Sequence, residues 1–203
     1  CGKGGFLIDI IDRFMIGLSP IIPDESIRYK IIVEECIYFS DISSINIFIC
    51  KLLIEPCNKY SLNFNIGNTL DLNIEEKWGI QRFHGVIGNP PYLNIDAIWG
   101  TKDPRLSYIK NRYPHIYTDK TDILFYFLEK SVSICKGEIG MIVSRSFLEA
   151  DKAFKLREWL ASNSRIREIL DFRTVEVFKG VGINTAIINL TKSKSVKNTS
   201  FKK

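Results

Sequence analysis

The stretch Val86-Ile87-Gly88-Asn89-Pro90-Pro91-Tyr92 decides the fold of this chain and points to its chemistry. A short apolar run leads directly into Asn-Pro-Pro-Tyr, which predicts a rigid turn at the end of a strand. Such a turn presents the amide of Asn89, the carbonyl of Pro90 and the aromatic ring of Tyr92. We predict that Asn89, Pro90, Pro91 and Tyr92 form a catalytic turn that binds a flat, amino-bearing group such as a nucleobase. A turn with a structural role alone is the alternative.

Strands and helices alternate along the rest of the chain. Helical spacing of apolar residues predicts helices at 6–18, 45–53, 123–135 and 153–161. β-favouring runs predict strands at 36–40, 62–66, 83–88, 139–143, 166–172 and 185–190. Residues 93–120 have weak periodicity and are expected to form a long loop. This order predicts an α/β fold with a mostly parallel, twisted sheet flanked by helices.

Polar groups and glycines fall at the expected strand ends, where α/β sheets bind ligands. Gly2-Lys3-Gly4-Gly5 precedes a helix and suits a charged ligand group, although it lacks the Gly-Lys-Ser/Thr ending of an ATP loop. Asp41 suits the two hydroxyls of a ribose, with a helix N-cap as the alternative role. Asn68 suits an adenine edge, and a turn beside Gly67 is equally expected. Together these groups predict a nucleoside cofactor with a charged tail.

A nucleobase in a DNA duplex reaches such a turn only if it is flipped out of the helix. Phe178 is the candidate for stacking on the second face of the flipped base, and core packing is its alternative role. Basic side chains interleaved with aromatic ones in the 93–120 segment suit a nucleic-acid surface, although an ordinary solvated loop is as well supported. The basic candidates are Lys102, Arg105, Lys110 and Arg112.

Composition narrows the classes of function. The chain has 203 residues, a size that suits one domain, and a formal net charge of +5, which mildly favours a polyanionic partner. Five cysteines without a Cys-x-x-Cys pair and only two histidines argue against a disulfide framework and a metal site. No apolar run approaches the roughly 18 residues of a membrane span. The cysteine usage makes a reduced, cytoplasmic compartment the default expectation.

The chain resembles the gamma-class adenine-N6 DNA methyltransferases of type II and type IIG restriction–modification systems. The resemblance lies in motifs that follow one another in family order. They are the loop Cys1-Gly2-Lys3-Gly4-Gly5-Phe6-Leu7, Asp41, Gly67-Asn68-Thr69-Leu70, Asn89-Pro90-Pro91-Tyr92, Asp122-Ile123-Leu124-Phe125, Gly140-Met141-Ile142-Val143 and Val177-Phe178. Lys3 stands where the family usually has Ser or Thr.

This resemblance implies a Rossmann-like methyltransferase fold and S-adenosylmethionine as the cofactor. The residues implied to bind it are Cys1, Gly2, Gly4, Phe6, Asp41, Ile42, Asn68 and Leu70. The implied partner is double-stranded DNA, with fused or partner domains for target recognition and cleavage. Methyltransferases of protein glutamine or RNA bases share the tetrapeptide and remain an alternative, as does a truncated, inactive DNA-binding module.

The resemblance also bears on domain organisation. The family has a central strand directly before the cofactor loop, and the sequence does not include it. We therefore expect an N-terminally truncated catalytic domain over residues 1–191 that is unstable or inactive alone. Residues 192–203 are expected to be a basic linker or tail toward a target-recognition domain.

Overall fold

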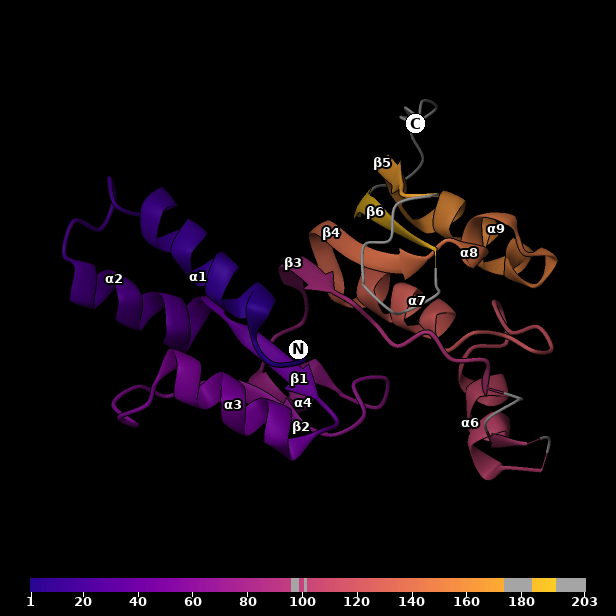
Figure 1. Cartoon of the computed structure of the whole chain (residues 1–203), viewed down its shortest axis with the longest axis horizontal. Coiled ribbons are helices and arrows are strands. Elements are labelled where there is room, and N and C mark those ends of the chain that lie inside the picture. The colour runs from indigo at the N-terminus through magenta and orange to yellow at the C-terminus, as the bar shows by residue number, and fades with distance from the viewer. Residues whose placement is uncertain (96–98, 101, 174–183, 193–203) are drawn as a thin grey trace. The chain divides into compact units, whose positions relative to one another are not determined.

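The computed structural model describes residues 1–95, 99–100, 102–173 and 184–192 (Figure 1). The chain divides into two compact units, Cys1–Ile80 and Gln81–Lys203. Each unit has its own sheet and its own helices. Each unit carries a different part of the candidate site.

The first unit places a pair of parallel strands among helices. Its elements are α1 Gly5–Gly17, α2 Glu25–Ile31, the π-helical turn η1 Ile32–Cys36, β1 Tyr38–Asp41, α3 Ser44–Ile54, β2 Asn63–Ile66 and α4 Ile74–Trp78. Strands β1 and β2 run parallel, and Asp41 lies opposite Ile66 at their carboxyl ends. Asp41 therefore reaches the edge at which α/β sheets bind ligands.

Side-chain caps fix where the helices of this unit begin. Asp24 accepts a hydrogen bond from the Ile27 N–H at 2.8 Å, and Ser43 accepts one from the Asn46 N–H at 3.3 Å. Asn73 caps α4 in the same way. Each cap satisfies an N–H group that the helix leaves without an internal partner. Ser43, rather than Asp41, is thus the N-cap of α3.

Apolar faces of these elements meet in one core. Leu7 and Ile11 of α1, Ile47 and Cys50 of α3, and Phe39 of β1 are all buried in it. Spacings of three and four residues place each helical pair on a single helix face. Packing of α1 and α3 on this core holds the glycine loop, which precedes α1, above α3.

The second unit is a four-stranded sheet with helices. Its elements are β3 Phe83–Gly88, α6 Pro104–Arg112, α7 Leu124–Ile134, β4 Cys135–Ser144, α8 Ser146–Glu149, the 3₁₀ turn η2 Asp151–Ala153, α9 Phe154–Asn163, β5 Arg165–Asp171 and β6 Thr185–Thr191. The strand order is β3-β4-β6-β5. Strand β3 pairs parallel with β4, and β6 pairs antiparallel with both β4 and β5.

Alternation along β4 and β6 gives this sheet its buried face. Met141 and Val143 of β4 are buried and lie opposite Ile188 and Ala186 of β6. Helix α7 packs against β4, and α9 packs against both α7 and β5. In this part of β4 every second residue is therefore buried, and it lies opposite a buried residue of β6.

The α/β fold is confirmed, and each expected helix and strand is present with ends shifted by a few residues. The sheet is mixed rather than mostly parallel, because β6 is antiparallel to both neighbours. The segment expected as a long loop contains the helix α6. Asp103 caps this helix by accepting from the Arg105 N–H at 2.8 Å, and Pro104 is its first residue.

Candidate functional site

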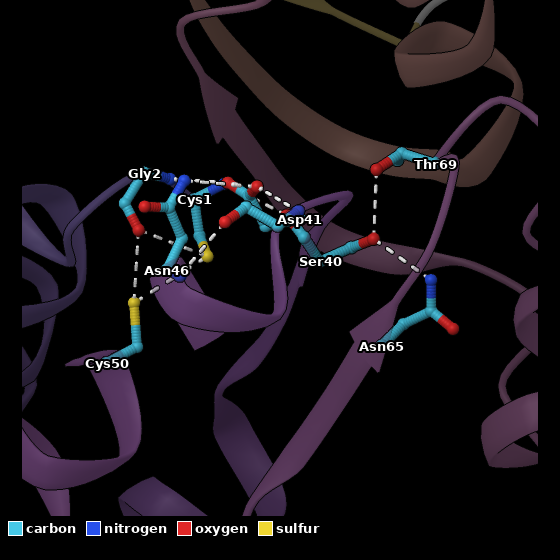
Figure 2. A network of polar contacts seen from close by, with 9 residues as sticks. Cys1, Gly2, Ser40, Asp41, Asn46, Cys50, Asn65 and Thr69 are labelled. Atoms are coloured by element: carbon cyan, nitrogen blue, oxygen red, sulfur yellow. Dashed lines mark hydrogen bonds and ion pairs between the residues drawn. The ribbon is translucent and has the colours of Figure 1, made fainter. Parts of the chain in front are cut away.

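Asp41 is the centre of a polar network at the carboxyl end of β1 (Figure 2). Its Oδ2 accepts from the Gly2 N–H at 2.8 Å and lies 3.1 Å from the Cys1 amino nitrogen. Its Oδ1 accepts from the Ser43 N–H at 2.9 Å and from the Asn46 side-chain amide at 3.2 Å. One carboxylate thus joins the glycine loop to the start of α3.

These hydrogen bonds keep Asp41 charged. Partial burial raises the pKa of Asp41, but hydrogen bonds from the Ser43 and Gly2 N–H groups, together with the amino group of Cys1, leave the pKa below its ordinary value. The carboxylate is therefore an anion at neutral pH, as binding of ribose hydroxyls requires. The site brings Asp41 together with Cys1 and Gly2, two of the other residues that we expect to bind the cofactor.

The glycine loop adopts backbone conformations that favour glycine. Gly2 and Gly4 have φ values of +58° and +89°. A side chain at Gly4 would also meet the Cys50 Sγ and a Leu53 methyl at 3.4 Å. Among the described residues, no side chain caps the start of α1, and its first turn holds no acidic residue. The first N–H groups of α1 thus suit the carboxylate of an amino-acid moiety.

Asn68 closes a turn in this structure. Its Oδ1 accepts from the Leu70 N–H at 3.2 Å, and its Nδ2 donates to Asp71 at 2.7 Å. These contacts are those expected if Asn68 is a turn residue beside Gly67. A role in binding an adenine edge stays a prediction for this residue.

The remaining cofactor candidates differ in exposure. Ile42, directly after Asp41, leaves 76% of its surface exposed, which suits an apolar contact to an adenine ring. Phe6 is half-buried in α1. Leu70 is 1% exposed, so its side chain belongs to the interior and only its main chain is available to a ligand.

Sequence reasoning did not single out three polar groups beside this network. The Ser40 hydroxyl lies 2.9 Å from that of Thr69 and accepts from the Asn65 amide at 3.2 Å (Figure 2). Ser40 and Asn65 are paired in the β1–β2 register. The sequence places a polar residue near the end of each strand. That the two residues lie side by side becomes evident only from the pairing of β1 with β2.

The turn Asn89–Tyr92 directly follows β3 in the second unit. Asn89 is exposed, and Pro90 behind it is buried. The Tyr92 hydroxyl donates to the Asn89 Oδ1 at 2.7 Å. Burial, together with the negative charge of Asp122, raises the pKa of Tyr92 to about 12. The amide is therefore at the surface, with its oxygen satisfied by the tyrosine of the same turn.

Gly88 lets the end of β3 lie close to β4. It pairs with Met141, and a Cβ at Gly88 would approach the Met141 Sδ to 3.2 Å. A larger residue there would have to displace the methionine side chain. The close pairing of β3 with β4 thus fixes the strand end from which Asn89 projects.

The four basic candidates, Lys102, Arg105, Lys110 and Arg112, are exposed on or near α6. The Arg105 guanidinium lies 4.6 Å from the Trp99 ring, and the Lys110 Nζ lies 5.1 Å from the Tyr117 ring. Arg105 also forms an ion pair with Asp103 at 2.7 Å, which reduces its free charge. Phe178 and most of the predicted tail lie outside the described residues.

Other kinds of site have no support among the residues that the structure describes. No group of three or more His, Cys, Asp or Glu side chains there could hold a metal ion. No described helix has the length and apolar character that a membrane crossing needs.

The sequence profile of the family described as "Eco57I restriction-modification methylase" matches residues 35–178. This match covers more than half of the chain and includes Asp41, Asn68 and the whole of Asn89–Tyr92. The chain belongs to this family. The chain is therefore a domain of a restriction-modification methylase.

Two curated relatives agree with the family. The "Type II restriction enzyme and methyltransferase RM.Eco57I" of Escherichia coli is 30% identical over 113 residues, which are 55% of this chain and 11% of that protein. The "Type II methyltransferase M.BstVI" of Geobacillus stearothermophilus is 30% identical over 100 residues, 48% of this chain and 17% of that protein. The match spans less than a fifth of either relative.

Solved structures agree on the fold. A nuclease-deletion mutant of the Type ISP restriction-modification enzyme LlaGI, in complex with a DNA substrate mimic, has a TM-score of 0.68 at 16% identity, over 96% of this chain and 20% of that one. A protein of Listeria monocytogenes titled a putative class I S-adenosylmethionine-dependent methyltransferase has a TM-score of 0.60 at 15% identity, over 80% and 47%.

Proposed function

We propose that this chain is the catalytic core of a DNA methyltransferase that methylates the N6 amino group of adenine. The observation that carries the proposal is the exposed Asn89 directly after β3, in a chain of the restriction–modification methylase family. The turn binds the adenine, and the loop and strand ends of the first unit bind the cofactor.

The chemistry needs two hydrogen-bond acceptors and no strong base. The Asn89 Oδ1 and the Pro90 carbonyl accept the two hydrogens of one exocyclic amine. Accepting both concentrates the nitrogen lone pair that the purine ring would otherwise delocalise. Tyr92 stacks on the ring, which orients the amine and excludes water from one face. When bound, S-adenosylmethionine supplies the electrophilic methyl group.

The residues that would hold the cofactor fit its three parts. Asp41 is charged and at a strand end, which suits the ribose hydroxyls. The uncapped start of α1 after Gly4 suits the carboxylate of the methionine part. The exposed Ile42 side chain suits the adenine ring. Cys1, Gly2, Phe6, Asn68 and Leu70 complete the proposed set.

The proposed polymer substrate is double-stranded DNA, contacted through Lys102, Arg105, Lys110 and Arg112, with Phe178 on the second face of the flipped base. Support comes from the exposure of the four basic side chains and from a structural neighbour titled as a complex with a DNA substrate mimic. Target recognition, and cleavage where it occurs, are assigned to fused or partner domains. We further propose that residues 1–191 form the methyltransferase catalytic domain and that the protein acts in the cytoplasm.

The test is methyl transfer by the complete gene product from isotope-labelled S-adenosylmethionine to unmethylated duplex DNA, with nucleosides separated by mass spectrometry. Label in N6-methyladenine alone is expected. Label in N4-methylcytosine would retain an amine methyltransferase but overturn the adenine assignment. Label only in RNA or in a protein glutamine would overturn the DNA assignment.

Asn89→Ala is the variant that ties this activity to the turn. We expect transfer to fall by about 100-fold or more, the typical loss for one preorganised hydrogen-bond partner in the transition state. Binding of S-adenosylmethionine, measured by calorimetry, should stay close to that of the wild type. Full turnover by Asn89→Ala would remove the role assigned to the amide.

A further inference from the structure

We propose that Asp122 is a positioning residue for the catalytic turn, which it holds by the main chain of Leu93. This inference rests on the proposed function, since it assigns Asn89–Tyr92 a binding geometry that must be maintained. Asp122 binds the residue that directly follows the turn, although the two are 29 residues apart along the chain.

A single carboxylate oxygen joins the turn to a helix. The Asp122 Oδ1 accepts from the Leu93 N–H at 3.0 Å and from the Leu124 N–H at 2.9 Å. Leu93 directly follows Tyr92, and Leu124 is the first residue of α7. The residue after the turn is thereby tied to the start of a helix that is distant in sequence.

Main-chain pairing around Asp122 makes the same connection. The Ile123 N–H donates to the Leu93 carbonyl at 2.9 Å, and the Ile95 N–H donates to the Thr121 carbonyl at 3.1 Å. These two bonds form an isolated antiparallel bridge between Asn94 and Asp122. The Asp122 side chain extends this bridge by one residue, so that it reaches the end of the turn.

The helix that anchors this bridge is rigidly packed. Leu124, Phe125, Tyr126 and Leu128 of α7 have no exposed surface. The Tyr126 hydroxyl lies 2.6 Å from the Thr121 hydroxyl in the interior. The backbone that carries Asp122 therefore cannot shift without disturbing the core.

β3 fixes the other end of the turn. Gly88 is paired with Met141 in the sheet, and Asn89 follows it directly. With Asn89 and Tyr92 each next to a fixed residue, the two ends of the tetrapeptide are held independently. Asp122 is the side chain that fixes the second end, and its partial burial raises its pKa despite the two N–H groups it accepts from.

The test compares Asp122→Ala, Asp122→Asn and the matched control Asp119→Ala in the complete gene product. Asp119 is an exposed aspartate three residues earlier in the same segment. Asp122→Ala should lower kcat for DNA methylation by about 100-fold, as expected for a misplacement of about 1 Å, and leave the Kd for S-adenosylmethionine unchanged. Asp122→Asn keeps an oxygen acceptor and should restore most of kcat. Asp119→Ala should behave as the wild type.

Two readouts do not depend on catalysis. Hydrogen exchange at the Leu93 amide should be faster in Asp122→Ala and close to that of the wild type in Asp122→Asn. The Tyr92 phenol should titrate at lower pH in both variants, because each removes the neighbouring negative charge.

Each outcome decides the proposal. Unchanged exchange at Leu93, wild-type kcat in a folded Asp122→Ala protein, or an Asp122→Asn protein as inactive as Asp122→Ala would overturn it. A wild-type protein that methylates no DNA would instead refute the proposed function. Exchange at the Leu93 amide would then still decide whether Asp122 positions the turn.

Discussion

Single carboxylates and amides determine most of what this site can do. Asp41 has hydrogen-bond donors around both of its oxygens, and Asn68 uses its oxygen and its nitrogen within one turn. Asn89, by contrast, is exposed, and its Oδ1 accepts from the hydroxyl of Tyr92 in the same turn. These differences in local bonding lead to separate expectations for substitutions.

Asp41→Asn should weaken S-adenosylmethionine binding by about 10- to 100-fold, because hydrogen bonds to charged groups contribute about 1.5–3 kcal/mol. An asparagine amide would also face N–H donors that the carboxylate now accepts from. Calorimetric titration of the complete gene product measures this, with Asp9→Asn on the exposed face of α1 as the control. Equal affinity in both variants would contradict the role of Asp41.

The same variant tests a pH effect. The pKa of Asp41 is lowered on folding, so its charge stabilises the fold above the ordinary aspartate pKa, and this contribution is lost as the pH falls through the folded value. The difference in unfolding free energy between the wild type and Asp41→Asn should therefore shrink in acid. Denaturant titrations at several pH values measure it, and a constant difference would show that the charge is not involved.

Tyr92 should be among the last phenols to ionise. Burial and the nearby Asp122 raise its pKa to about 12, so it remains a hydrogen-bond donor to Asn89 well above neutral pH. Ultraviolet titration of the wild type and Tyr92→Phe should differ by one phenol that titrates near this value. A difference centred near pH 10, the ordinary value for tyrosine, would contradict the buried setting.

At the scale of helices and strands, apolar periodicity predicted the elements well, because burial imposes a period of 3.6 on α7 and a period of 2 on β4. It did not predict the short helices α2, α4 and α8, and it failed for α6, whose composition is polar and whose apolar positions are few. Asp103-Pro104 before Leu106 and Ile109 was the available signal, since it is a cap followed by residues on one helix face. Chain direction in the sheet was not predictable, because antiparallel β6 carries the same alternation as a parallel strand.

The candidate site was predictable only in part. Asn89, Gly2 and Asp41 stand at strand or loop ends that sequence patterns reveal. The contacts of Asp122 with Leu93 and of Ser40 with Thr69 join segments about thirty residues apart, so no local pattern contains them.

Two isoleucines of one sheet test the assignment of its buried face. Ile188 of β6 has no exposed surface, whereas Ile87 of β3 is 51% exposed. Ile188→Ala should lower the unfolding free energy by about 2–5 kcal/mol. Ile87→Ala should change it by no more than about 0.5 kcal/mol, as is usual for surface positions. Equal losses measured by denaturant unfolding would show that both faces of the sheet are covered.

At the scale of the whole molecule, the net charge of +5 bears on the proposed DNA partner. The four basic candidates near α6 are exposed, which allows contact with phosphates. Each phosphate contact made by a protein on B-DNA contributes about 0.9 to the slope of log affinity against log salt concentration. Long-range charge and local contacts can therefore be separated by experiment.

Replacing Lys102, Arg105, Lys110 and Arg112 together with alanine should make this slope less steep, by up to about four times the contribution of one phosphate contact. A smaller change is expected from Arg105, which is already paired with Asp103. A charge-matched variant with alanine at Lys30, Lys77, Lys136 and Arg165, all exposed, is the control. Equal slopes in the two variants would mean that net charge, rather than the α6 region, governs binding.

The bond from Tyr92 to Asn89 has a consequence for substrate choice. In the proposed reaction the incoming amine meets an amide oxygen that already accepts one hydrogen bond. Because an amide oxygen has two lone pairs, the amine must either share this oxygen with the phenol or displace the phenol. We expect a base that also gains stacking and backbone contacts as part of DNA to do so more readily than a free nucleoside.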